Sequence, residues 1–229
     1  MAEDSSISSI SSILDPAEQA TLRAAFLNIL FNDSASASSS HRLLGVPSPE
    51  MSLATYLALH GPLDYTPTLQ LVLDIQHQLE LLAKDWQAGI LYFRLADIVV
   101  LPDKNNNNNN SKSTSNNSNS NNNSPQRFLL ADYTHFGEFD KRRPEFFRLV
   151  HPMEFTGAFL APELTSSLEQ KCLPFRARDN VSQYSLAKLA QHCLGPAISQ
   201  SPAFQLTKLG TLLRRCLAPL PANRTFLYL

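Results

Sequence analysis

The chain has 229 residues and a formal net charge of −1, which fits one domain or little more and excludes a nucleic-acid interface built on a basic face. Hydrophobic residues make up 43% of the sequence, enough for a core although a tract of Asn and Ser dilutes the figure. No apolar stretch approaches the roughly 18 residues that span a bilayer, and the first residues lack the pattern of a signal peptide. We therefore expect neither nucleic acid nor a membrane as a partner.

The three cysteines, Cys172, Cys193 and Cys216, are an odd number and lack the spacing of a zinc site. This pattern is typical of buried free thiols in a reducing compartment. We expect an intracellular protein, and the cytoplasm as its compartment.

The N-terminal part of the chain predicts one helix. Residues 1–14 are rich in Ser and are predicted to be disordered. Asp15-Pro16 is typical of a helix start, and the apolar residues that follow predict an amphipathic helix to about Asn32. A linker of Ser and Ala, residues 33–40, ends it.

Two further helices are predicted before residue 85. The first lies over Ser52–Leu57, and Gly61-Pro62 ends it. The next begins near Tyr65 with Thr66 as its cap. From residue 68 to 84 apolar side chains fall on nearly every side, which predicts a buried helix.

A short β-hairpin is predicted from two apolar segments that lie far apart in the sequence. Ile98–Leu101 favours a buried strand, and Phe128–Leu130 would be its partner. The polar tract 103–126 has nothing to bury, and we interpret it as an insert at the hairpin tip, where loop closure costs little. Asp132 follows the second strand. About thirty residues of predicted loop come next, a length that indicates a functional segment.

Several motifs, in register along the chain, resemble those of protein kinases. Asp132-Tyr133-Thr134 stands where kinases carry DFG, and after a gap the size of an activation loop comes Ala161-Pro162-Glu163, an intact APE. Ser52–Leu57 resembles the helix that opens the kinase C-lobe. Tyr184–Ala187 resembles the core of the F helix, and Leu209–Arg224 resembles the last helix and turn.

The resemblance implies a mainly α fold with a small β-hairpin. Residues 51–229 would form a kinase-like C-lobe, interrupted by the insert at 103–126. Residues 15–50 would be the remnant of an N-lobe reduced to about one helix.

The resemblance also implies what a phosphoryl-transfer site would need, namely a Gly-rich loop, a strand Lys and a catalytic Asp. Gly45 is the only glycine before Gly61, and no Lys precedes Lys84. The HRD position falls on Ile90-Leu91-Tyr92 or, in a second alignment, on Tyr92-Phe93-Arg94. Neither supplies the proton-accepting Asp, because Tyr, with an ordinary pKa near about 10, is a poor base at neutral pH. We therefore predict no catalytic residue.

Two acids could still hold a cation. Asp132 occupies the DFG position and Asp97 the position of the metal-binding Asn, so residual binding of Mg-ATP is one interpretation. The other, which we favour, is that Asp132 caps the start of the loop and Asp97 is a solvated turn acid. The histidines His135, His151 and His192 lack metal-ligand spacing and are expected at the surface or in caps.

The scaffold residues implied by the resemblance are better preserved. Glu163 of the APE motif and Arg224 match a buried ion pair, for which the planar guanidinium of Arg is well suited. The F-helix Asp that anchors the catalytic loop of kinases falls on Ser182. We therefore expect this anchor to be lost, with Asp179 one turn earlier as a substitute cap.

These features predict a pseudokinase-like interaction or regulatory module that needs no cofactor. It would bind a protein partner through its helical lobe or its long loop, where Lys141-Arg142-Arg143 could bind an acidic segment. One alternative is a divergent ATP-binding protein kinase. Another is a truncated or decayed kinase-like gene product.

Overall fold

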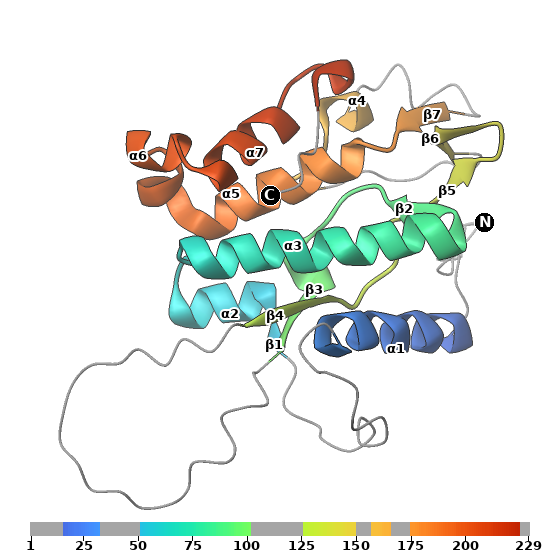
Figure 1. Ribbon diagram of the computed structural model, residues 1–229, viewed down its shortest axis with the longest axis horizontal. Coiled ribbons are helices and arrows are strands. Elements are labelled where there is room, and N and C mark those ends of the chain that lie inside the picture. Colours follow the sequence, from blue (N-terminus) through green and yellow to red (C-terminus); the bar gives the residue numbers. More distant parts are fainter. Residues whose placement is uncertain (1–15, 33–50, 102–125, 150–156, 166–174, 225–229) are drawn as a thin grey trace, which may run out of the picture.

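The computed structural model of the chain (Figure 1) describes residues 16–32, 51–101, 126–149, 157–165 and 175–224. Within these ranges the fold is mixed α/β, with helices in the majority and two small antiparallel sheets. The predicted disorder at 1–14 and almost all of the insert lie outside the described residues. None of the described helices is long and apolar enough to cross a membrane.

Helix α1 (Pro16–Asn32) confirms the predicted N-terminal helix. Leu22 and Phe26, one turn apart, are buried, and the helix contacts α3 and β4. The ring of Phe26 lies 6.1 Å from that of Tyr133, centroid to centroid. Helix α1 therefore covers the residue that follows Asp132.

The first sheet contains the predicted hairpin. Strand β3 (Ile98–Leu101) pairs with β4 (Arg127–Leu130), with Ile98 opposite Leu130 and Leu101 opposite Arg127. The insert therefore connects the end of β3 to the start of β4, at the turn end of the hairpin. A third strand, β1 (Met51–Ser52), was not predicted and pairs with β3, so that the strand order is β1-β3-β4.

Helices α2 (Leu53–His60) and α3 (Tyr65–Leu81) confirm the next two predicted helices. Gly61, with φ of 81°, ends α2, a conformation that glycine adopts without strain. The prediction of Thr66 as the cap of α3 is wrong, because Asp64 holds that position and Thr66 lies in the first turn. A π-helical turn, Leu82–Trp86, continues α3.

Helix α3 packs into the core on one side, while His77 and Glu80 are exposed on the other, so the prediction of a helix buried on every side is wrong. Thr68, Asp74 and Gln78 are polar residues on its buried side. Gln78 donates from Nε2 to the carbonyl oxygen of Phe128 (2.9 Å) and accepts at Oε1 from the N–H of Leu130 (2.9 Å). Asp74 accepts from the N–H of Phe128 (2.9 Å) and pairs with Arg127 (3.1 Å). Because β4 is an edge strand, these side chains satisfy backbone groups that would otherwise be buried without partners.

A second sheet replaces much of the predicted long loop. Strands β5 (Phe136–Asp140) and β6 (Arg143–Leu149) lie inside it, between β2 (Ala88–Ile90) and β7 (Phe175–Arg178), in the order β2-β5-β6-β7. The single-hairpin prediction is therefore wrong. In β6 the buried Phe147 and Leu149 flank the exposed Arg148, a period of two that is typical of a strand with one buried face.

The C-terminal part is helical, with α4 (Pro162–Thr165), α5 (Val181–Ser199), α6 (Pro202–Gln205) and α7 (Lys208–Cys216). Helix α5 confirms the helix predicted from residue 179 and lies beside α3 (Figure 1).

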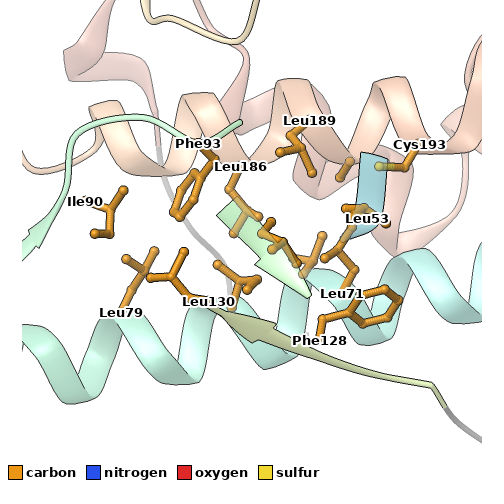
Figure 2. Close-up of a cluster of buried hydrophobic side chains, with 14 of the residues drawn as sticks. Leu53, Leu71, Leu79, Ile90, Phe93, Phe128, Leu130, Leu186, Leu189 and Cys193 are labelled. Carbon is orange, nitrogen blue, oxygen red and sulfur yellow. The ribbon is translucent and has the colours of Figure 1, made fainter. Parts of the chain in front are cut away.

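The larger hydrophobic core lies between α3, α5 and the first sheet, where Leu71 and Leu79 of α3 approach Leu186 and Leu189 of α5 (Figure 2). Cys193 and Cys216 are buried free thiols, as predicted, and burial raises the pKa of each to about 12. Cys172 lies outside the described residues. A smaller core lies under the second sheet; its buried members are Leu91, Tyr92, Phe147, Leu149, Ala161, Leu164, Ala177 and Val181.

Candidate functional site

The segment between β2 and β3, for which the resemblance to kinases predicts a catalytic loop, is held by two serines of α5. The hydroxyl of Ser182 donates to the carbonyl oxygen of Ile90, and the hydroxyl of Ser185 accepts from the N–H of Phe93 at 2.8 Å. All four groups are buried. The expectation that Ser182 leaves this segment without an anchor is therefore wrong, because two neutral hydroxyls hold its backbone. The helix cap is Asn180 and not Asp179.

Asp97 lies in a 3-10 turn, Leu95–Asp97, at the end of this segment. Its carboxylate accepts from the backbone N–H of Arg94 (2.8 Å) and from Nε of the same residue (2.9 Å). The side chain is only 3% exposed, so the interpretation of a solvated turn acid is wrong. Burial raises the pKa of Asp97, and the hydrogen bonds from Arg94 offset this only in part.

Asp132 approaches from the other side. Its backbone N–H, like that of Ala131, donates to the carbonyl oxygen of Asp97, which fixes β4 against the turn. Its Oδ1 accepts from the N–H of Thr134 (2.8 Å), so Asp132 caps the start of the loop as predicted. Burial acts to raise the pKa of Asp132, but the bonds from Thr134 and the charge of Arg94 outweigh it and leave the pKa below its ordinary value.

The guanidinium of Arg94 joins the two acids. Its Nη2 lies 2.8 Å from Oδ1 of Asp97 and 3.0 Å from Oδ2 of Asp132. One nitrogen therefore binds both carboxylates, and the interactions with Asp97 raise the already high pKa of Arg94. We refer to Arg94, Asp97 and Asp132 as the Arg94 cluster.

The Arg94 cluster does not fit a magnesium–nucleotide site in this arrangement. Magnesium needs an octahedral set of oxygen ligands, and here the oxygens that face each other are bound to a fixed cation. A divalent ion would also be repelled by the guanidinium unless Arg94 moved away. Within the described ranges no group of three or more His, Cys, Asp or Glu is arranged for a metal.

His135 extends the site beneath the surface. Its ring stacks on that of Tyr92, with centroids 3.8 Å apart and planes at 25°. The residue is buried, which corrects the surface position expected for it, and its Nε2 has no hydrogen-bond partner among the described residues. Burial, together with the charge of Arg94, lowers the pKa of His135 to about 4. His135 is therefore neutral at physiological pH and fills space beside the cluster.

Glu163 and Arg224 form a separate site, at α4 and the C-terminal turn. Nη2 of Arg224 donates to Oε2 of Glu163 at 2.8 Å while Nη1 binds Oε1, and further bonds reach the carbonyl oxygens of Ala218 and Pro219. The guanidinium also lies over the ring of Tyr184, 4.6 Å from its centroid. This two-point pair ties α4, which begins at Pro162 directly after Ala161, to the C-terminal turn.

The structure thus brings together the predicted residues in two sets, Asp97 with Asp132 and Glu163 with Arg224. The sequence analysis does not predict the role of Arg94 as the bridge between the two acids. Its spacing of three residues before Asp97 in a short turn is the sequence feature that could have indicated it. No family model matches the chain, and no curated protein matches it either.

Proposed function

We propose that the chain is a pseudokinase-like interaction module, a kinase-like C-lobe scaffold that binds a protein partner and transfers no phosphate. The observation that carries the proposal is the guanidinium of Arg94, which binds both acids that a kinase would use for magnesium. A permanent cation of the chain itself binds both acids and offsets one of their two negative charges, so that they hold each other in place without metal or nucleotide.

The positions of the motif residues support the kinase-like scaffold. Asp132 follows an edge strand and lies beside the turn that ends in Asp97, as the resemblance requires. Glu163 of the APE motif binds Arg224 at two points. Helix α1 packs on Tyr133, the aromatic residue of the DFG-like triplet, which suits a single helix left from an N-lobe.

The catalytic side of the resemblance has no such support. Tyr92 takes the place of the catalytic Asp in one alignment, and it is buried against His135. A buried phenol in this position is not placed to accept a proton from a substrate hydroxyl at the surface.

Thermal denaturation with Mg-ATP tests the proposal. A ligand that binds only the folded state stabilises it by about 2.7 kcal/mol at a concentration of 100 Kd, which raises the Tm by several degrees. We expect no rise at millimolar Mg-ATP. A clear rise that the Asp132→Asn substitution abolishes would overturn the proposal in favour of a divergent ATP-binding kinase, and phosphoryl transfer to a general substrate would then be measured.

A further inference from the structure

Strand β7 forms one edge of the second sheet and carries two exposed arginines, Arg176 and Arg178. Its partner β6 lies on one side only, with Arg148 opposite Arg176 and Phe146 opposite Arg178. These four side chains share one face, because successive residues of a strand point to opposite faces. We refer to this face as the Arg face; on the other face, Phe147 and Ala177 are buried in the smaller core.

The register shows which backbone groups of β7 face outward. The N–H of Asp179 donates to the carbonyl oxygen of Glu145, so this pair is a hydrogen-bonded pair of the antiparallel ladder. Hydrogen-bonded pairs alternate with pairs that exchange no bonds, and Arg178 and Arg176 fall in the second kind. Their N–H and C=O groups therefore point away from β6, and no described residue bonds to them.

The electrostatics of the Arg face favour an anionic partner. Arg148 and Arg176 lie directly opposite each other, and like charges in that position destabilise a sheet. Asp140 binds Arg176 at 2.9 Å, and among the described residues no acid forms a salt bridge with Arg148 or Arg178. The turn between β5 and β6 adds Lys141 and Arg142, and Arg143 begins β6; all three cations are exposed. Positive charge thus gathers here on a chain whose net charge is −1.

A groove runs beside β7 and can accept apolar side chains. It has a volume of about 320 Å3 and lies between the strand on one side and the C-terminal turn on the other. Phe146, Phe175 and the 63% exposed Leu220 contribute apolar surface to its walls. Glu163 also lines it, but Arg224 neutralises this acid. The volume is at the lower end of the range for ligand pockets, so it holds few side chains.

We propose that β7 binds an extended acidic peptide as an additional strand. Backbone bonds to Arg176 and Arg178 would hold the peptide, since an exposed sheet edge is a ready template for strand addition. Alternate acidic side chains would lie on the Arg face, and the apolar residues between them would lie toward the groove. A second copy of this chain is disfavoured as the occupant, because antiparallel pairing of two β7 strands sets arginine against arginine. This inference deepens the proposed function by naming the surface and the chemistry of the partner.

The probe is a fluorescein-labelled octapeptide that alternates Glu with Val, and its binding to the full chain is measured by fluorescence anisotropy at low ionic strength. We expect saturable binding that the same peptide with Lys in place of Glu does not show. The Arg176→Glu/Arg178→Glu variant should weaken binding by about tenfold or more, because like charges across an interface are strongly unfavourable. The control Arg214→Glu/Arg215→Glu makes the same charge change at exposed positions of α7 and should alter it less than about twofold.

A second probe separates strand addition from simple charge attraction and needs no variant of the chain. Methylation of alternate backbone nitrogens on the pairing edge of the peptide removes donors without changing its charge. We expect this peptide to lose binding, while methylation of the opposite edge leaves it unchanged. Absence of binding by the first peptide, equal weakening by both double variants, or indifference to the methylated edge would each overturn the inference. None of these results depends on Mg-ATP, so the proposed function and this inference can fail separately.

Discussion

Arg224 and Arg94 each bind carboxylates, but in different surroundings. The side chain of Arg224 is fully buried and that of its partner Glu163 is 16% exposed, whereas Arg94 is 42% exposed and its partner Asp132 is 41% exposed. Removing one partner of a buried ion pair costs stability, because the other charge is left buried without a partner. At an exposed ion pair, water can take the place of the missing partner. The comparison teaches that the Arg224 pair should support the fold more than the half-exposed pair of Arg94 and Asp132 does.

The largest expected effect is at Arg224. The substitution Arg224→Met leaves the carboxylate of Glu163 and two carbonyl oxygens without their donor, and removal of one partner of a buried pair typically costs about 3–5 kcal/mol. We expect a loss of this size in the free energy of unfolding, measured by urea denaturation. Arg215→Met, at an exposed position of α7, is the matched control. A loss below about 1 kcal/mol would contradict the supporting role of the buried pair.

The next effect concerns His135, which lies against the Arg94 cluster. Its folded pKa of about 4 is below the ordinary value of 6.5, so the unfolded chain binds the proton more tightly. The stability is therefore complete above pH 6.5 and is lost as the pH falls toward 4, by at most about 3 kcal/mol at 1.36 kcal/mol for each pKa unit. His135→Phe should remove this part of the pH dependence, and His77→Gln, on the exposed side of α3, should retain it.

The measurement is the free energy of unfolding between pH 4 and 7 for each variant. Arg94 and Asp132 are the charged groups that face His135. If the wild-type protein and His135→Phe show the same dependence of stability on pH, the prediction that His135 is buried and neutral is wrong.

The features that could be predicted from the sequence depend on local patterns. The amphipathic pattern predicts α1, the run that is apolar on nearly every side predicts α3, and the apolar segments predict the β3–β4 pair across a long polar insert. The proximity of Glu163 and Arg224 could be anticipated only through the resemblance to kinases, since the two residues are 61 positions apart.

The missed features depend on partners that are distant in sequence. The roles of Asp74 and Gln78 could not be predicted from the helix itself, which looks apolar on nearly every side. The strand edge that they bind lies about fifty residues further on. Strands β5 and β6 were assigned to a loop because a kinase-like activation segment was expected there, although Phe147 and Leu149 alternate with exposed residues. A serine in place of the expected carboxylate predicts no anchor, yet the hydroxyl of Ser182 donates to the carbonyl oxygen of Ile90, 92 positions away.

A smaller loss of stability is expected when Gln78 is substituted, because its side chain fixes β4, the strand just before Asp132. Gln78→Leu keeps a similar volume but leaves the carbonyl oxygen of Phe128 and the N–H of Leu130 without a partner, at a cost of about 2 kcal/mol. Hydrogen exchange of the Leu130 amide should become faster. The amide of Leu129, which by the alternation of the ladder faces β3, should change less. Equal changes at both amides would show that the whole strand loosens and that Gln78 is no specific anchor.

The smallest effect on stability, and the sharpest test of the comparison, is Arg94→Ala. Asp132 is half-exposed, and the buried Asp97 keeps its bond from the backbone N–H of residue 94, so we expect a loss of only about 1 kcal/mol, far less than at Arg224. The loss should be greater at pH 7 than at pH 4, since the substitution leaves the buried Asp97 charged, and protonation at low pH relieves that cost. The Tm of the variant should also rise with millimolar Mg²⁺, which can now reach both carboxylates, while the Tm of the wild-type protein should not. The variant Arg94→Ala/Asp132→Asn removes one of the two acids and should lose this response. An Arg94→Ala variant that ignores magnesium would show that the guanidinium does not stand in for a metal.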